Sequence, residues 1–431
     1  MRVITRAGLG LALVLTMLAV AVHAQGVYVS PPHCWWYWQV NGTYAVLYNY
    51  GTEAYTIYLM TPSEFNALYH YEGTYTLGSW VLQPQSSIAI QIPSVGDYVV
   101  IALSSASCPS EPTVYMHYGY GAPIGISSFE PVNTTAVLGF FNITSISAYN
   151  PVTEFGIPNS GASLQLNAVL EVQLVNGVTQ YYWLQDVVEF ETDNNEYELF
   201  DAVWNYTSWY GMLNYTTVIG RGYITQTPFG YAYGFGTIPQ LCGLPQNYST
   251  PLAGYLLIRL ASTNPLVISF CISIIQMGSQ YYPPSFVCFD NVTISTQQPV
   301  ASAKIITQPS TITPSNNAID TELVFGGYAN GEYTTFTSMN AYLSLMYWNG
   351  SEWVPYGDLF MNGWDTAETA TDLVSTALPN GFVYVTTGES PSNGSSTFLA
   401  STIPTPVLPM TYVSILNTAS NESWSGYVTS P

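Results

Sequence analysis

Carboxylic acids are the main chemically active side chains of this sequence. Its 431 residues include 26 Asp and Glu, against 5 Lys and Arg and 4 His. No histidine follows residue 121, so a histidine-based triad, a His-ligated zinc site or a Cys–His pair is not available in that part of the chain. Two carboxyl groups that share one proton can instead supply one acid and one base, and this arrangement suits chemistry at low pH.

Asp186 has the most unusual surroundings of these acids. It lies in an aromatic stretch, residues 181–187 (YYWLQDV), where an acid is costly unless it is paired or functional. Asp201 and Asp290 have similar surroundings, but such positions are more often occupied by structural carboxylates. Asp186 is therefore the first candidate for a reacting group.

Glu322 and Asp365 lie beside motifs of their own. Glu322 begins a stretch that leads into a glycine pair at 326–327, which permits close approach of another backbone. Asp365 with Glu368 (WDTAE) superficially resembles the Asp-Thr-Gly of pepsin-like enzymes. Asp-x-x-Glu before residues 367–378 is also a helix N-cap pair, and capping is the interpretation we prefer.

The composition of two further segments could indicate a functional site, but each segment also has a purely structural explanation. The acids of the polar turn ETDNNEYE are expected to be solvated: Asp193, Glu196 and Glu198. The aromatic, glycine-rich residues 229–236 predict either a packed hairpin with glycine kinks or a mobile flap over a cleft. The aromatic residues that we assign to such a cleft or flap are Trp183, Tyr231 and Tyr233.

The elements that must position these residues are β-strands. Apolar residues alternate with mostly polar ones over residues 163–174, so one face of this strand is core. Asn176-Gly177 then predicts a two-residue hairpin turn. That turn would place Asn167 opposite Asp186, with Gln185 directed to the core and Asp186 to the other face.

Most of the remaining chain also has strand signals. We predict an all-β fold, with residues 122–431 forming an antiparallel β-sandwich catalytic domain. Further strands are expected at residues 254–262, 266–275, 286–295, 301–306, 322–328 and 341–348.

A small β-sandwich-like domain is expected before this large one, over residues 25–107. One short helix should interrupt it, because Thr61-Pro62-Ser63-Glu64 supplies an N-cap, a first-turn proline and the glutamate of a capping box. Residues 108–121 are interpreted as a linker. Residues 1–24 are interpreted as a secretory signal peptide, with two arginines, an apolar run and a small-x-small cleavage site.

The charge balance excludes nucleic acid as a partner and indicates an acidic environment. The formal net charge is −21, and removal of the signal peptide would leave three basic residues, so nucleic-acid binding is excluded. Self-repulsion of this size disfavours a compact state at pH 7 but vanishes when the carboxyls are protonated. We interpret the composition as adaptation to an acidic exterior; general solubility is the alternative. No second apolar run is long enough to span a bilayer.

The cysteines and the sequons also fit export. We expect disulfides between Cys34 and Cys108 and between Cys271 and Cys288, with Cys242 unpaired. Ten Asn-x-Ser/Thr sequons offer glycosylation sites: Asn41, Asn133, Asn142, Asn205, Asn214, Asn247, Asn291, Asn349, Asn393 and Asn421.

Six ordered motifs between about residues 118 and 400 resemble the thermopsins, a family of secreted acid proteases from hot, acid-living archaea. They are APIGISSF (122–129), NITS (142–145), YWLQDV (182–187), DAVWN (201–205), ELVFGG (322–327) and DTAE (365–368). The resemblance implies endopeptidase activity at low pH and high temperature, sensitivity to pepstatin and a preference for large hydrophobic residues around the cut. It implies no settled catalytic pair, and the domain before residue 108 departs from the shortest members.

The sequence therefore predicts an exported acid endopeptidase that acts on proteins or peptides without metal or cofactor. Asp186 and Glu322 are the preferred pair, followed by Asp365 and Asp201; a variant pairs Gln185 with Glu322, because an amide can orient water and stabilise an oxyanion. Two rival functions remain: a glycosidase with paired carboxyls in an aromatic cleft, and a noncatalytic envelope protein.

Overall fold

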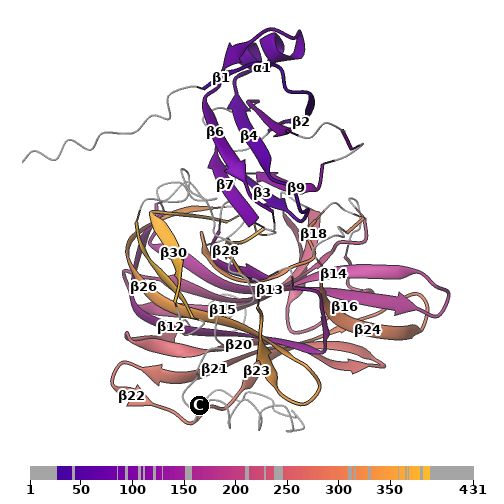
Figure 1. The fold of residues 1–431 in the computed structure, drawn as a ribbon. Coiled ribbons are helices and arrows are strands. Elements are labelled where there is room, and N and C mark those ends of the chain that lie inside the picture. Colours follow the sequence, from indigo (N-terminus) through magenta and orange to yellow (C-terminus); the bar gives the residue numbers. More distant parts are fainter. Residues whose placement is uncertain are drawn as a thin grey trace, which may run out of the picture.

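The computed structural model is almost entirely β, as predicted. It describes residues 27–388 except 41–43, 85, 93–95, 105–107, 110–111, 120–122, 129, 151–157, 209–212, 228–229, 237–245, 309–312, 315–316, 329–331, 358, 365, 367 and 379–381. The predicted signal peptide lies outside the described residues. A small unit (residues 27–119) stands on one side of a large unit (residues 123–388), as Figure 1 shows.

The small unit is a sandwich of two antiparallel sheets with its own apolar core. One sheet contains β2 (Cys34–Gln39), β8 (Tyr98–Leu103), β4 (Tyr55–Met60) and β6 (Gly78–Leu82) in this order, and the other contains β7 (Ser86–Gln91), β3 (Tyr44–Asn49) and β9 (Val114–Gly119). A short pair, β1 (Tyr28–Val29) and β5 (Thr74–Tyr75), lies beside them.

The helix of the small unit is α1 (Pro62–Tyr69), and it begins where the sequence predicted. Thr61 Oγ1 accepts from the N–H of Glu64, while the Glu64 carboxylate accepts from the N–H of Thr61 (2.8 Å), so the capping box is complete. The expected linker is wrong in part, because residues 114–119 form β9 and pair with β3.

Two large sheets face each other in the large unit. The first sheet contains, in spatial order, β17 (Tyr223–Thr227), β18 (Gly230–Gly236), β15 (Glu196–Asn205), β14 (Thr179–Glu191), β13 (Gly161–Leu174), β25 (Thr321–Gly326), β10 (Ile124–Ser128) and β28 (Leu359–Asn362). Its side strands are β11 (Val132–Thr134), β19 (Gln246–Asn247) and β24 (Val300–Thr307).

The second sheet contains, in spatial order, β16 (Val218–Ile219), β23 (Val287–Ile294), β21 (Leu266–Met277), β20 (Leu252–Thr263), β12 (Ala136–Tyr149), β26 (Tyr333–Trp348), β31 (Val383–Thr387) and β30 (Leu373–Ala377). Its side strands are β22 (Gln280–Tyr281), β27 (Trp353–Pro355) and β29 (Thr369–Thr371). The helix expected over residues 367–378 is therefore wrong: β29 and β30 occupy this stretch, and half of their residues are β-branched.

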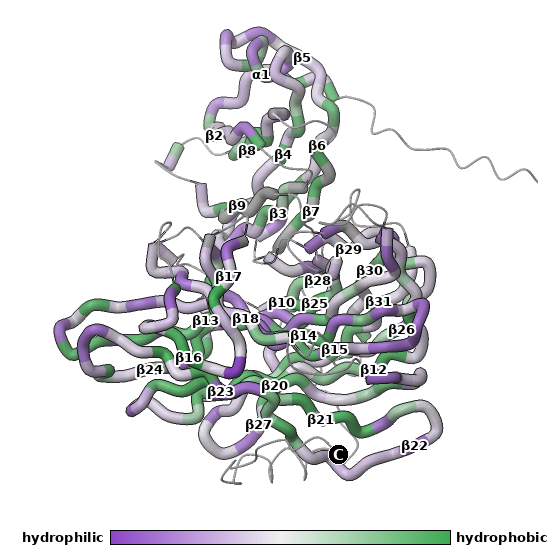
Figure 2. The backbone as a smooth tube through the Cα atoms, turned by 180° about the vertical axis from the view of Figure 1, so that it is seen from behind, coloured by the Kyte–Doolittle hydropathy of each residue, from purple (hydrophilic) through white to green (hydrophobic). Residues whose placement is uncertain are grey.

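The core of the large unit lies between the two sheets. Leu164, Leu166 and Leu170 of β13 project into it, as their spacing predicted, and meet apolar residues of β20 and β21. Leu166 and Leu323 lie beside Gly139 of β12, in the opposite sheet. Figure 2 shows the hydrophobic colour running along β20 and β21 inside this unit.

Both expected disulfides are present, Cys34–Cys108 and Cys271–Cys288, while Cys242 lies outside the described residues. No helix among the described residues is long and apolar enough to cross a membrane. The sequon residues Asn41, Asn393 and Asn421 lie outside the described part. Asn133, Asn214, Asn247, Asn291 and Asn349 are exposed, and Asn142 and Asn205 are half-buried.

Candidate active site

The hairpin between β13 and β14 decides which side chains share a face. Its loop has three residues rather than two, because Leu174 and Val178 pair through their backbones and Gly177 takes a φ of +85°. Asp186 therefore lies opposite Leu166, and Gln185 opposite Asn167. The predicted register was wrong by one residue, which reverses both faces: Asp186 points into the core and Gln185 points outward.

The outer face of the first sheet carries a lateral row of polar side chains on three neighbouring strands. Gln185 of β14 lies opposite Asn167 of β13, and Asn167 lies opposite Glu322 of β25. Because neighbouring strands are about 4.8 Å apart, the backbones at Gln185 and Glu322 are about 10 Å apart with Asn167 between them. Two of the predicted site residues, Gln185 and Glu322, are thus brought together.

Hydrogen bonds connect this row from end to end. Trp204 Nε1 donates to Gln185 Oε1 (3.0 Å), and Gln185 Nε2 donates to Gln165 Oε1 (3.0 Å). Asn167 Nδ2 donates to Glu322 Oε1 (2.7 Å) and to Gln165 Oε1 (3.3 Å). The network fixes the orientation of Gln185 and Glu322 through side chains of the same face.

Glu322 is completely buried, and its second oxygen is also occupied. Glu322 Oε2 accepts from the backbone N–H of Trp364 (2.7 Å). A second carboxyl lies near the row, because Gln165 Nε2 reaches Glu368 Oε2 at 3.5 Å and Thr366 donates to the same oxygen. The outer face therefore combines two carboxyls with three amides.

Another carboxyl pair lies further along the same face. Glu189 and Glu198 occupy directly opposed positions on β14 and β15, and each is 7% exposed. Burial, followed by repulsion from Glu198, Glu368, Glu332 and Glu191, raises the pKa of Glu189 well above its usual range. The prediction that Glu198 is solvated was wrong: the strand begins at Glu196, earlier than the polar composition suggested.

A second group of acids lies between the sheets. Asp186 and Asp201 are opposed on β14 and β15, and both are completely buried. Asp186 Oδ2 accepts from the backbone N–H of Leu257 in the facing sheet (3.1 Å). Burial raises the pKa of Asp186 well above its usual range, and the backbone N–H groups of Leu257 and Cys271 offset only part of this rise.

Asp201 has fewer hydrogen-bond partners than Asp186. Burial, followed by repulsion from Asp290 and Asp186, raises the pKa of Asp201 well above its usual range. Neither Asp201 oxygen meets a donor at full hydrogen-bond geometry among the described residues. The charge of Arg221 and the backbone of Phe235 offset only part of the cost.

Asp290 extends this group toward the edge of the sandwich. It accepts hydrogen bonds from the Tyr233 hydroxyl and from the backbone N–H of Arg221 (3.1 Å). Burial raises the pKa of Asp290, and the bond from Tyr233 is the largest opposing effect. Asp290, Asp201 and Asp186 thus form a line of carboxyls running into the core.

The preferred pair of Asp186 and Glu322 is not supported, because these residues lie on opposite faces of one sheet and cannot act on one water molecule. Asp201 lies on the inner face with Asp186, where the apolar core of the sandwich surrounds both. Asp365 lies outside the described residues. Gln185 and Glu322 are the predicted pair that shares a face.

The aromatic residues expected to form a cleft or flap lie in different places. Tyr233 is 1% exposed and belongs to the core, so the flap interpretation is wrong for it. Tyr231 is half-buried, and its hydroxyl donates to Gln226 Oε1 (3.4 Å). Trp183 lies on the outer face, stacked on Tyr206 (5.5 Å between centroids) and opposite Trp204. Trp183, which is 5% exposed, and the half-buried Trp204 thus form an aromatic pair beside Gln185.

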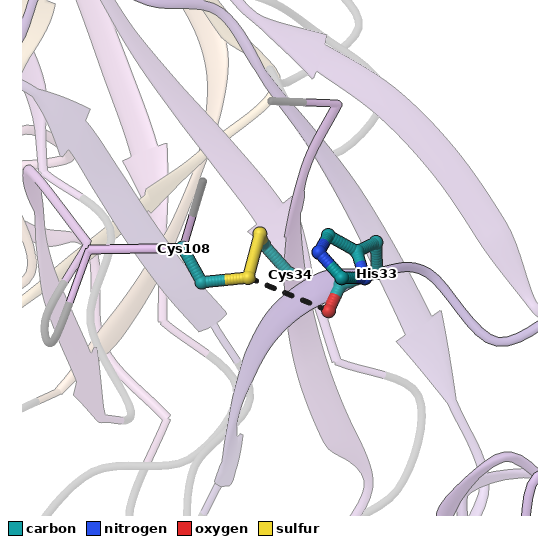
Figure 3. A group of neighbouring side chains, drawn as sticks. All are labelled: His33, Cys34 and Cys108. Carbon is teal, nitrogen blue, oxygen red and sulfur yellow. Dashed lines mark hydrogen bonds between the residues drawn. A yellow bond between two sulfur atoms is a disulfide. The ribbon is translucent and has the colours of Figure 1, made fainter. Parts of the chain in front are cut away.

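One group of potential metal ligands occurs in the described part of the chain. Figure 3 shows it: His33, Cys34 and Cys108. Both sulfurs are joined in the disulfide, and Cys108 Sγ lies 3.6 Å from the carbonyl oxygen of His33. No thiolate is left to bind a metal, so this group is a structural bridge.

Gln165, Trp204 and the role of Asn167 were not predicted from the sequence, and neither Glu189 nor Glu368 was among the preferred reacting groups. Gln165 and Asn167 occupy the polar positions of the alternating strand, so their shared face was visible in the sequence. Their connection to Gln185 was not predicted, because the expected two-residue hairpin loop directs Gln185 to the core.

Comparisons with known proteins match most of the large unit together with β9. The sequence model of the thermopsin family matches residues 110–373. A thermopsin from Sulfolobus acidocaldarius is 34% identical over 275 residues, which cover 61% of this chain and 79% of that protein. The matched region contains every residue of the outer-face row.

Proposed function

Because this chain belongs to the thermopsin family, we propose that it is an endopeptidase active at low pH whose reacting groups are Glu322 and Gln185. It is a thermopsin-type protease; we propose which side chains are its reacting groups and that it acts at low pH. One observation carries it: Glu322 and Gln185 are held on the same outer face by one hydrogen-bond network.

The competing carboxyls are poorly placed for a substrate. Asp186 and Asp201 lie between two sheets, among side chains such as Leu166 and Phe235. A peptide in extended form could reach them only if the sandwich opened. The outer face requires no such separation of the two sheets, because it points away from the second sheet, and residues 363 and 364 lie over Glu322 there.

The chemistry follows from the groups in the row. The ionised Glu322 carboxylate takes a proton from water as the water oxygen bonds to the peptide carbonyl carbon. The Gln185 amide N–H donates to the oxyanion that develops on the carbonyl oxygen. Glu322 then gives its proton to the leaving nitrogen as the C–N bond breaks. The spacing of about two strand separations leaves room for the water and the carbonyl between the two groups.

The aromatic residues beside Gln185 suit the proposed preference for large hydrophobic residues, because the half-buried Trp204 leaves ring area for a substrate side chain. Trp183 is stacked on Tyr206, and the half-buried Trp204 ring lies beside them. Apolar side chains gain binding free energy on such rings. The acidic composition supports work in an acidic exterior, and we propose that the protein is exported.

The test replaces the two groups with isosteric side chains. Glu322→Gln should lower kcat by about 10²- to 10⁴-fold, which is the usual contribution of general acid–base catalysis. Gln185→Met should lower kcat by about 10²- to 10³-fold with little change in KM, as expected for loss of an oxyanion donor. Hydrolysis of a denatured protein is measured between pH 1 and 7 after any activation step is complete.

Two controls make the result specific. Glu171→Gln changes a carboxyl on the same strand as Asn167 that pairs with Lys304 (3.2 Å), and it should leave kcat unchanged. Asp186→Asn should retain activity at pH 2 to 3 if the folded fraction is retained. Full activity of Glu322→Gln, or complete loss in folded Asp186→Asn, would move the reacting groups to the inner face.

A further inference from the structure

We propose that the small unit is an inhibitory cap: Tyr48 packs on Phe360 and Trp364 and holds residues 363 and 364 over Glu322, and the enzyme becomes competent when this contact is released. The inference rests on the proposed function of Glu322. It assigns a role to the module that precedes the thermopsin-like sheets.

Residues 363 and 364 lie directly on the Glu322 carboxyl. Trp364 donates its backbone N–H to Glu322 Oε2 (2.7 Å). A Cβ added to Gly363 would lie 2.5 Å from the same oxygen, so the backbone approaches as closely as glycine permits. Glu322 has no exposed surface, and a peptide carbonyl cannot reach it while this segment is in place.

The segment is fixed at its base by the large unit. Trp364 Nε1 donates to Ser127 Oγ (2.9 Å), and the N–H of Gly363 donates to the carbonyl of Pro123 (3.1 Å). Pro123 directly precedes β10, the first strand of the large unit. These bonds set the position of the segment, and its apolar side chains require a cover of their own.

The small unit contributes to that cover with the ring of Tyr48. Tyr48 lies at the end of β3, with its ring 4.8 Å from that of Phe360 and 5.8 Å from that of Trp364. All three side chains are at most 2% exposed and form one cluster with Ala318, against which Tyr50 packs. Loss of Tyr48 would expose the rings of Phe360 and Trp364 to water, which favours a rearrangement that moves Trp364 and uncovers Glu322.

The small unit can leave without breaking a sheet. Among the described residues, no strand of the small unit pairs with a strand of the large unit. The small unit has a separate core and closes its ends with the Cys34–Cys108 disulfide. Its attachment at Tyr48 is therefore a side-chain contact, which a cut in the connecting chain or a single substitution can weaken.

The experiment compares the initial activity of the intact chain with that of a cap variant. Tyr48→Ala should cleave a denatured protein at pH 2 to 3 from the first minute, at least tenfold faster than the intact wild-type chain. Tyr48→Phe keeps the ring and should behave as wild type. Tyr75→Ala, an exposed tyrosine on the far part of the small unit, is the matched control and should also behave as wild type.

A second measurement uses the unmodified chain, in case Tyr48→Ala does not fold. The wild type should show a lag at low pH that ends as an N-terminal fragment is released. Full initial activity of the intact chain, with no lag, would overturn the cap while leaving the protease intact. Absence of cleavage by every form at every pH would overturn the protease proposal and the cap together.

Discussion

The buried pair Asp186 and Asp201 makes the stability of the large unit depend on low pH, and Asp201→Asn should reduce that dependence. Both carboxyls are completely buried and directly opposed, with few donors around them. Burial, followed by repulsion from Asp290 and Asp186, raises the pKa of Asp201 well above its usual range, so the folded protein keeps this group protonated. Asparagine has nearly the same shape and does not titrate.

The sign and the size follow from proton linkage. The unfolded chain releases the Asp201 proton near pH 3.9, whereas the folded chain retains it until the raised folded pKa. The stabilisation is fully present below the unfolded pKa and is lost as the pH rises through the folded pKa. Within this window the free energy of unfolding falls by about 1.4 kcal/mol per pH unit for each such group. For Asp186 and Asp201 together it falls by about 2.7 kcal/mol per pH unit.

The curves of unfolding free energy against pH for wild type and Asp201→Asn should therefore cross. Below pH 3 the buried amide of Asp201→Asn lacks partners and should cost about 1 to 3 kcal/mol. Above pH 4 the variant should lose stability more slowly than wild type, by about 1.4 kcal/mol per pH unit. Urea unfolding followed by circular dichroism at pH 2 to 6 measures both effects.

The control is Asp193→Asn, which changes an exposed acid in the turn between β14 and β15. Its curve should run parallel to that of wild type. The reasoning is refuted if Asp201→Asn also runs parallel to wild type, or if wild-type stability rises between pH 4 and 6.

Three further perturbations have defined outcomes. Removing the Cys34–Cys108 bridge by a double alanine substitution should destabilise the small unit by about 4 kcal/mol, because the bridge closes a loop with a sequence separation of 74; an unchanged unfolding midpoint for that unit would contradict this. Thr61→Ala should cost about 1 kcal/mol through loss of the capping box, visible as faster amide exchange in α1; Ser63→Ala is the comparison. Tyr233→Phe removes the hydroxyl that donates to Asp290 and accepts from the N–H of Gly222, and it should cost about 1 to 3 kcal/mol of stability. Its activity per folded molecule at pH 2 should stay unchanged. Loss of that activity would implicate the inner acids in catalysis.

Local patterns predicted much of the fold. The alternation over residues 163–174 identified β13 and its core face, and Thr61 with Glu64 located α1. Both disulfides were expected from the places of the cysteines, because Cys34 and Cys108 bracket the small domain and Cys271 and Cys288 lie in adjacent strands. These features depend on neighbouring residues or on a pairing with few alternatives, so they can be read without knowledge of the remaining chain.

The face of each β14 side chain could not be read in the same way. Residues 182–190 are all buried, because the second sheet covers one face while side chains such as Tyr206, which is stacked on Trp183, lie over the other. In a strand buried on both faces, period-two alternation disappears, and the sequence YWLQDVVEF gives no direction to Gln185 or Asp186. The aromatic surroundings of Asp186 correctly indicated a buried acid, but burial alone does not distinguish a reacting group from a carboxyl held between sheets. Only the one-residue choice of hairpin loop, made at Gly177, separates the two.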